Sequence, residues 1–148
     1  MGATKGVALG AGLLGLVLLS LGAPNACGGT SNDVIGPEGG ELVSEDGMFT
    51  LEIPPDALTS EVEVSIHEVA CDQEGEAACY EVRPEGLAFR EPAVATYEAS
   101  ELMSMEHVSL SAKGAMGWQA LADQEVDRDE EIVVASVLYL SSFSVQAQ

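Results

Sequence analysis

The chain has 148 residues, which is enough for one domain of ordinary size and too few for two domains with separate hydrophobic cores. Five basic residues stand against 25 acidic ones, and the formal net charge is -20. Binding to phosphate backbones depends on lysine and arginine side chains that release counterions. We therefore expect no nucleic-acid partner.

Residues 1–26 have the three-part layout of a secretory signal peptide. Lys5 supplies the positive start, residues 7–23 form an almost unbroken apolar run, and Ala26 is a small residue near the expected cleavage point. A retained membrane helix is the alternative, but a helix needs about 20 apolar residues to span a bilayer. The run is shorter than that and contains four glycines, so we expect export with cleavage.

Cys27 is the odd member of three cysteines, and an exported chain with three cysteines leaves one over after pairing. Cys27 follows the apolar run directly and precedes a polar, glycine-containing stretch. This arrangement resembles a bacterial lipoprotein signal, in which the cysteine becomes the acylated first residue of the mature chain. The resemblance implies lipidation of Cys27, with residues 27–33 as a flexible tether. The alternative is ordinary cleavage with Cys27 free or bridged to another chain.

Cys71 and Cys79 lie eight residues apart in the body of the chain. Disulfides form by default in the oxidising compartments that exported proteins enter, so we expect these two cysteines to pair. On the chain-entropy model the bridge stabilises the fold by about 2.5 kcal/mol. Metal binding at the pair is less favoured, because neither a second cysteine pair nor a nearby histidine completes a set of four ligands.

From Val34 onward, short apolar runs alternate with turn-forming residues at spacings near ten, a pattern typical of all-β proteins. We expect half-buried strands at residues 49–53, 62–67, 80–83, 93–97, 108–111, 118–121 and 143–145. Residues 132–140 are apolar in both phases, which favours a central strand, and residues 100–105 suggest a helical turn. The sequence therefore predicts one domain over residues 34–148, an antiparallel β-sandwich of seven to nine strands in two sheets.

Three segments carry a family resemblance. Residues 36–42 (GPEGGEL), 47–58 (GMFTLEIPPDAL) and 62–66 (VEVSI) resemble, in order and spacing, the opening of a ZU5 domain, and residues 80–92 are similar to its next segment. The resemblance implies a β-sandwich that serves as a protein-interaction module and that also occurs in bacterial surface lipoproteins. Asp56 stands where the family prefers glycine, and aspartate tolerates the left-handed backbone region better than most residues.

Some ZU5 relatives cleave themselves at a His-Phe-Ser site near the end of the domain. The matching tripeptide here is Ser142-Phe143-Ser144. Without the histidine, Ser144 has no obvious base to activate it, so we do not expect autoproteolysis.

His67 and His107 both fall on the polar phase of their expected strands, so we expect them at the surface and not as catalytic bases or metal ligands. We accordingly expect no catalytic residue, no cofactor and no enzymatic activity. A carboxylate-dependent hydrolase is a weaker hypothesis that remains open, because 25 acidic residues offer many pairs.

Residues 123–131 hold the densest acidic run of the chain. Hard oxygen ligands at alternating positions, here Asp127, Asp129 and Glu131, are of the kind that binds calcium. The run lacks the glycine and the full spacing of a known calcium loop, so we prefer a charged turn and expect no metal.

Together these patterns predict an exported, non-enzymatic lipoprotein of the bacterial cell envelope, held to the membrane by lipid on Cys27. Its β-sandwich would bind an envelope or extracellular protein that the sequence does not identify. The alternatives are a calcium-dependent adhesion or envelope module that uses residues 123–131, and, for localisation, soluble secretion or an N-terminal membrane anchor.

Overall fold

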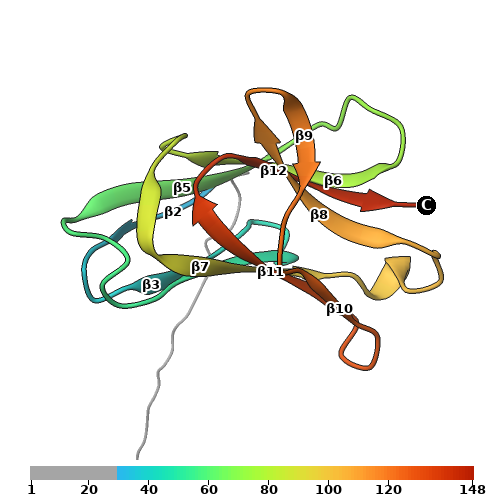
Figure 1. Ribbon diagram of the computed structural model, residues 1–148, viewed down its shortest axis with the longest axis horizontal. Helices are drawn as coiled ribbons and strands as arrows, with labels where there is room; N and C mark the ends of the chain where they lie inside the picture. Colours follow the sequence, from blue (N-terminus) through green and yellow to red (C-terminus); the bar gives the residue numbers. More distant parts are fainter. Residues whose placement is uncertain (1–29) are drawn as a thin grey trace, which may run out of the picture.

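The computed structural model describes residues 30–148, so the predicted signal peptide and Cys27 lie outside the described residues. The described chain forms two antiparallel β-sheets packed together (Figure 1). The strand order is β10-β11-β7-β4-β3 in the five-stranded sheet and β2-β5-β6-β12-β8-β9 in the six-stranded sheet. The predicted all-β sandwich is confirmed. Within residues 30–148, no helix is long and apolar enough to cross a membrane.

Within residues 30–148 the strands follow one another with short connections and one 3-10 turn. In chain order they are β2 (Thr30–Ile35), β3 (Gly40–Val43), β4 (Phe49–Ile53), β5 (Val62–Val69), β6 (Glu76–Arg83), β7 (Ala88–Glu98), the turn η3 (Ser100–Leu102), β8 (Val108–Gly114), β9 (Gly117–Ala120), β10 (Glu125–Asp127), β11 (Ile132–Tyr139) and β12 (Ser142–Ala147). The described residues thus contain more strands than the sequence pattern predicted.

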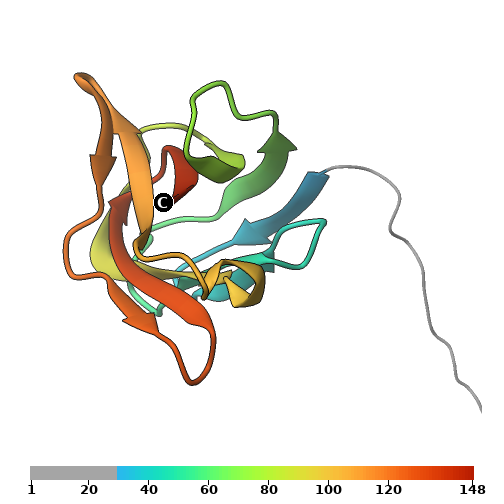
Figure 2. The same cartoon turned by 90° about the vertical axis from the view of Figure 1, so that its right-hand side faces the viewer.

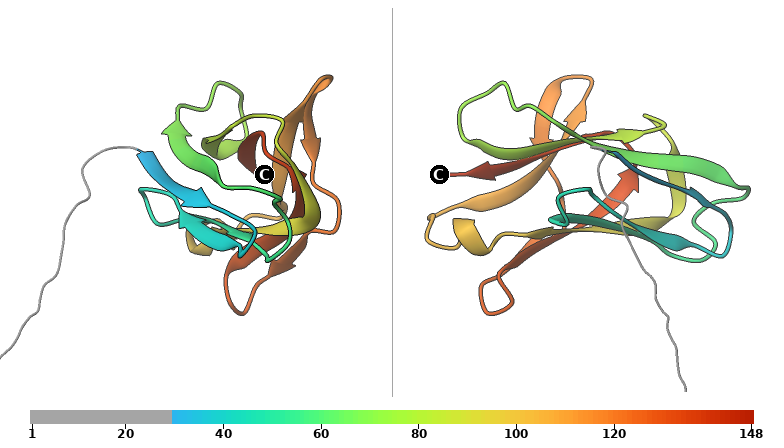
Figure 3. Two further views of the ribbon diagram at one scale, coloured as in Figure 1. Left: turned by 90° about the vertical axis from the view of Figure 1, so that its left-hand side faces the viewer. Right: turned by 180° about the vertical axis from the view of Figure 1, so that it is seen from behind.

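The predicted flexible tether over residues 27–33 overlaps the strand β2 (Thr30–Ile35). Residues 30–33 are part of a strand and not of a flexible linker, because six residues of β2 pair with β5 from Thr30 to Ile35. Ile35 at the end of this strand is 3% exposed and packs into the core. The ordered domain therefore starts by Thr30, four residues before the predicted boundary. β2 and β3 lie side by side although they belong to different sheets (Figure 3).

The strand predicted at residues 93–97 is longer in the structure, where β7 covers Ala88–Glu98. The strand does not begin after Pro92 but at Ala88, and it runs through the proline. The register with β11 shifts between the pairs Val137↔Ala93 and Tyr139↔Ala88. A proline is tolerated at such an irregularity, because no ladder hydrogen bond from its missing N–H is required there.

The core lies between the sheets and is built around aromatic rings. Phe49 on β4 stacks on Tyr80 on β6 with ring centroids 4.8 Å apart, and contacts Phe143 on β12 at 5.6 Å. All three side chains are fully buried. Because burial of one such side chain stabilises a fold by about 2 kcal/mol, this cluster is a principal contact between the sheets.

The motif residues at 36–58 meet at one corner of the sandwich. Gly39 has a φ of +82°, and a Cβ there would lie 2.5 Å from the carbonyl oxygen of Ile53. The Asp56 amide donates a 2.8 Å hydrogen bond to the carbonyl of Pro37, and Asp56 itself has a φ of 68°. Aspartate tolerates this left-handed conformation better than most residues, so Asp56 fits the turn without a glycine.

Candidate functional site

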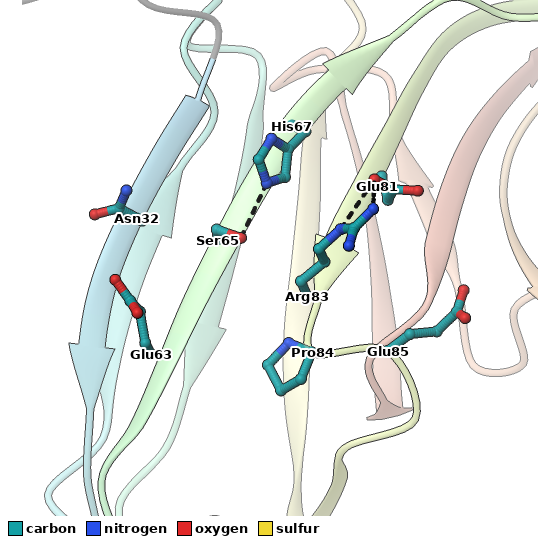
Figure 4. Close-up of a pocket in the computed structure, with 8 residues that line it drawn as sticks. All are labelled: Asn32, Glu63, Ser65, His67, Glu81, Arg83, Pro84 and Glu85. Atoms are coloured by element: carbon teal, nitrogen blue, oxygen red, sulfur yellow. Dashed lines mark hydrogen bonds and ion pairs between the residues drawn. The ribbon is translucent and has the colours of Figure 1, made fainter.

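An open hollow of about 630 Å³ lies on the outer face of the six-stranded sheet, over β2, β5 and β6 (Figure 4). It is lined mainly by polar and charged side chains. They are Asn32, Glu63, Ser65, His67, Glu81, Arg83, Pro84 and Glu85.

Strand alternation decides which side chains of β5 reach the hollow. Val64 and Ile66 are fully buried between the sheets. Successive side chains of a strand point to opposite faces, so Glu63, Ser65 and His67 face outward. The predicted outward orientation of His67 is confirmed.

Strand register brings the other lining residues beside β5. Ser65 lies opposite Asn32 on β2 and opposite Arg83 on β6. His67 lies opposite Glu81. These side chains come from three segments of the chain, and each local pattern shows only that its residue faces outward.

Two polar contacts organise the hollow (Figure 4). Arg83 donates to Glu81 Oε1 from Nη2 at 2.8 Å and from Nε at 3.1 Å. Ser65 Oγ and His67 Nε2 lie 3.1 Å apart. The arginine side chain is 62% exposed, and an exposed ion pair of this kind adds about 1 kcal/mol at most to stability. Its guanidinium and carboxylate are therefore accessible to a partner.

The charge of the hollow is negative on balance. Glu63, Glu81 and Glu85 bring three carboxylates against the single guanidinium of Arg83. Glu63 and Glu85 are exposed at the surface. Such a surface complements a positively charged group and repels an anionic one.

A second polar cluster lies around Asp46, in the turn between β3 and β4. Its Oδ2 accepts a 2.7 Å hydrogen bond from the Tyr80 hydroxyl. Desolvation alone would raise the pKa of Asp46, but hydrogen bonds from Ser44, the Met48 amide and Tyr80 outweigh it, so the pKa lies below its ordinary value of 3.8. Burial, followed by the bond to Asp46, raises the pKa of Tyr80.

Glu68 on β5 belongs to the same cluster. A hydrogen bond with Asp46 is the main reason that the pKa of Glu68 lies above its ordinary value, and desolvation adds to the effect. A glycoside hydrolase needs its two carboxyl groups far enough apart, about 5 Å or more, to flank the scissile bond. A hydrogen-bonded pair does not have that spacing, and the carboxylate-dependent hydrolase stays a prediction from the sequence.

The disulfide between Cys71 and Cys79 forms as predicted, with Cα atoms 5.5 Å apart. It joins the 70–75 loop to β6. One oxygen of Glu76 and both sulfurs lie within 4.8 Å of one another. Ser144 Oγ donates a 2.9 Å hydrogen bond to Glu76 Oε1. The sequence offered no sign of this Glu76–Ser144 contact, because the two residues are 68 positions apart.

The tripeptide at 142–144 lies in β12, between β6 and β8. Phe143 and Ser144 are both fully buried. The structure thus gives Ser144 a carboxylate neighbour, Glu76, although no local pattern in the sequence indicates this contact. The absence of autoproteolysis stays a prediction.

The acidic run at 123–131 forms β10 and the turn into β11, which projects from the body of the sandwich (Figures 1 and 2). Asp127 Oδ1 accepts hydrogen bonds from the amides of Asp129 at 3.0 Å and Glu130 at 2.9 Å. Arg128 donates a 2.7 Å bond to the carbonyl of Met103. These contacts are those of a charged turn.

The candidate calcium ligands in this run are Asp127, Asp129 and Glu131. Within residues 30–148, one group of side chains brings three potential metal-ligating atoms close together, and it consists of Cys71, Glu76 and Cys79. None of the three calcium candidates belongs to this group.

His107 is exposed and lies 3.8 Å from a carboxylate oxygen of Glu106.

No protein-family model matches the sequence, and no curated protein matches it. The ZU5 resemblance therefore stays a prediction from the motifs.

Proposed function

We propose that this protein is a non-enzymatic binding module of the bacterial cell envelope. Residues 1–26 direct its export, lipid on Cys27 anchors it to the membrane, and its ZU5-like β-sandwich binds another protein outside the cytoplasm. The leader, the odd cysteine and the motifs at residues 36–66 support the location and the family. The negatively charged hollow over β2, β5 and β6 is the observation that carries the binding function.

The partner is a basic segment of an envelope or extracellular protein. The described residues hold four of the five basic residues and all 25 acidic ones, which gives them a net charge of −21. Two of those four cations are already engaged, Arg83 with Glu81 and Arg128 with backbone carbonyls. Charge complementarity therefore has to come from the partner.

The binding site is tested with a fluorescent lysine-rich peptide and the full chain in detergent. The double substitution Glu63→Gln with Glu85→Gln is expected to weaken binding about tenfold, since it removes two carboxylates at the hollow. The matched control is Glu41→Gln with Glu52→Gln, which removes two carboxylates that lie opposite each other on β3 and β4 of the other sheet. Equal losses in the two variants would show unspecific attraction to an acidic protein and no site.

The anchor is tested separately. Intact mass spectrometry of the membrane-extracted protein, expressed in a bacterium with its own leader, is expected to show a chain that starts at acylated Cys27. The Cys27→Ser chain should lose the modification and the membrane association. An unmodified chain that starts near Cys27 would refute lipidation, and a chain that starts at Met1 would indicate a retained membrane anchor.

A further inference from the structure

We infer that Cys71, Cys79 and Glu76 form a redox-gated site for a thiophilic divalent cation, with Zn²⁺ as the probe. While the disulfide is intact the site is closed, and reduction opens it. This inference holds whether or not the outer hollow binds a basic segment.

The three ligand groups are already close together. The two sulfurs and one carboxylate oxygen of Glu76 lie within 4.8 Å of one another. Zinc bonds sulfur at about 2.3 Å and oxygen at about 2.1 Å, so ligand atoms around one zinc ion lie roughly 3.5 Å apart. Side-chain rotation after reduction is enough to reach that spacing. The required backbone movement is small, because the Cα atoms of the cysteines are only 5.5 Å apart.

The backbone around the site is held by the sheet. Cys79 lies within β6, opposite Val69 on β5 and Ser144 on β12. Its side chain is 4% exposed. Cys71 lies in the 70–75 loop, two residues after the end of β5 at Val69. The Gly75 carbonyl in this loop accepts a 2.8 Å hydrogen bond from the amide of Ala147 in β12. Opening the disulfide therefore leaves Cys79 held in the sheet and Cys71 in a short loop whose two ends join the paired strands β5 and β6.

The Glu76 carboxylate is oriented by hydrogen bonds of its own. Ser144 Oγ donates to Oε1 at 2.9 Å, and the Gln73 amide donates to Oε2 at 2.9 Å. Gln146 Nε2 donates in turn to Ser144 Oγ at 2.9 Å. Partners of this kind fix the orientation of a metal-binding carboxylate. A disulfide alone requires no such carboxylate beside it.

The chemistry balances in two steps. A dithiol reductant donates two electrons and two protons, the Sγ–Sγ bond breaks, and the reductant leaves as its own disulfide. Both protein thiols then lose their protons to water as the thiolates bind the cation. Two thiolates and a carboxylate supply three ligands, and water takes the fourth position of a tetrahedral zinc site.

The test uses the full chain in detergent, with Cys27→Ser so that only Cys71 and Cys79 carry sulfur able to ligate as thiolate. The protein is reduced with a phosphine, which takes up oxygen from water as the disulfide breaks, and the phosphine is removed under nitrogen. Zn²⁺ affinity is then measured by competition with a chromophoric chelator. Co²⁺ reports thiolate ligation through its charge-transfer absorption in the near ultraviolet.

The reduced chain is expected to bind one Zn²⁺, and the oxidised chain none at the same concentration. Glu76→Gln should weaken binding about tenfold or more, because it removes the charged oxygen ligand and even the loss of an outer-shell partner costs about 10 to 100-fold. Glu74→Gln, in the loop just before β6, should not weaken binding. Equal binding by oxidised and reduced protein, or equal affinity of the two glutamine variants, would overturn the inference.

Loss of the disulfide could also unfold the domain, so circular dichroism is recorded on each sample. The Cys71→Ser, Cys79→Ser chain shows whether the fold persists without the bridge, and it should bind no Zn²⁺. If the reduced chain unfolds, Zn²⁺ should restore its β-sheet spectrum and should fail to restore that of the double serine chain. A reduced chain that stays unfolded in Zn²⁺ overturns the inference.

Discussion

The Tyr80 hydroxyl donates a 2.7 Å hydrogen bond to Asp46 Oδ2 and thereby ties the two sheets together. Tyr80 lies on β6 of the six-stranded sheet, whereas Asp46 lies in the turn between β3 and β4 of the five-stranded sheet. The Asp46 carboxylate also accepts hydrogen bonds from the Ser44 hydroxyl and the Met48 amide. One carboxylate therefore shapes a turn and fixes that turn to the opposite layer.

Tyr80→Phe is expected to lower the free energy of unfolding by about 1.5 kcal/mol, because it removes a hydrogen bond to an ionised group and keeps the buried ring. The melting temperature should fall by about 5 to 10 °C. Thermal unfolding followed by circular dichroism measures the change. Tyr97→Phe is the matched control, since within residues 30–148 the Tyr97 hydroxyl makes no hydrogen bond. A larger loss in that control would contradict the assigned role of Tyr80.

Asp46→Asn is expected to destabilise the fold in a pH-dependent way. The pKa of Asp46 is lower in the folded chain than its ordinary value of 3.8, so folding favours the ionised form. The stability that this form contributes is fully present above about pH 4 and is lost as the pH falls through the folded pKa.

Urea unfolding of both chains across the pH range measures the prediction. The two curves should lie apart at neutral pH and approach each other in acid. A constant separation at every pH would show that the loss comes from the shape of the turn and not from its charge.

Glu68→Gln is expected to act in the opposite direction. The pKa of Glu68 is raised in the folded chain, chiefly by the hydrogen bond with Asp46, so folding favours its protonated form. At neutral pH both carboxyl groups are ionised and repel each other, and the amide removes that repulsion. The variant should gain less than about 1 kcal/mol at neutral pH, because Glu68 is exposed to solvent screening, and the gain should disappear below pH 4. A destabilised variant at neutral pH would contradict the repulsion.

Much of the fold could be predicted from local sequence patterns. Where the observed strands differ from the predicted ones, the difference has a physical cause. β4 and β5 were predicted because alternation of apolar and polar residues is a property of neighbouring positions. The first half of β2 is a polar stretch at a sheet edge, and it is a strand only because its backbone pairs with β5. Pro92 signals a strand break by itself and is tolerated at the irregular register between β7 and β11.

The candidate sites were harder to predict from the sequence than the strands, because they depend on contacts between distant segments. The sequence indicated that His67 faces outward, but the hollow also needs Asn32 and Arg83, which reach it through the register of three strands. The carboxylate of Glu76 meets Ser144 across two paired strands. Such contacts depend on tertiary pairing, which no local period encodes.

Gly39→Ala is expected to cost more than the same substitution at another left-handed glycine. Gly39 has a φ of +82°, and its Cβ would lie 2.5 Å from the Ile53 carbonyl oxygen and 2.9 Å from the nitrogen of Pro55. Gly47 has a φ of +77°, but a Cβ there meets nothing within 4 Å. Left-handed backbone alone costs an alanine about 1 kcal/mol, which sets the expected loss for Gly47→Ala.

The Gly39 variant has to move backbone at the corner where residues 36–42 meet residues 53–55, so its loss should be about 3 kcal/mol. Chemical denaturation of the two alanine variants at one pH makes the comparison direct. Similar losses of unfolding free energy in the two variants would mean that the backbone at this corner moves at little cost. Gly39 would then be required only for its left-handed backbone conformation. A larger loss at Gly39 would assign it a steric role as well, since only a residue without a Cβ fits against the Ile53 carbonyl.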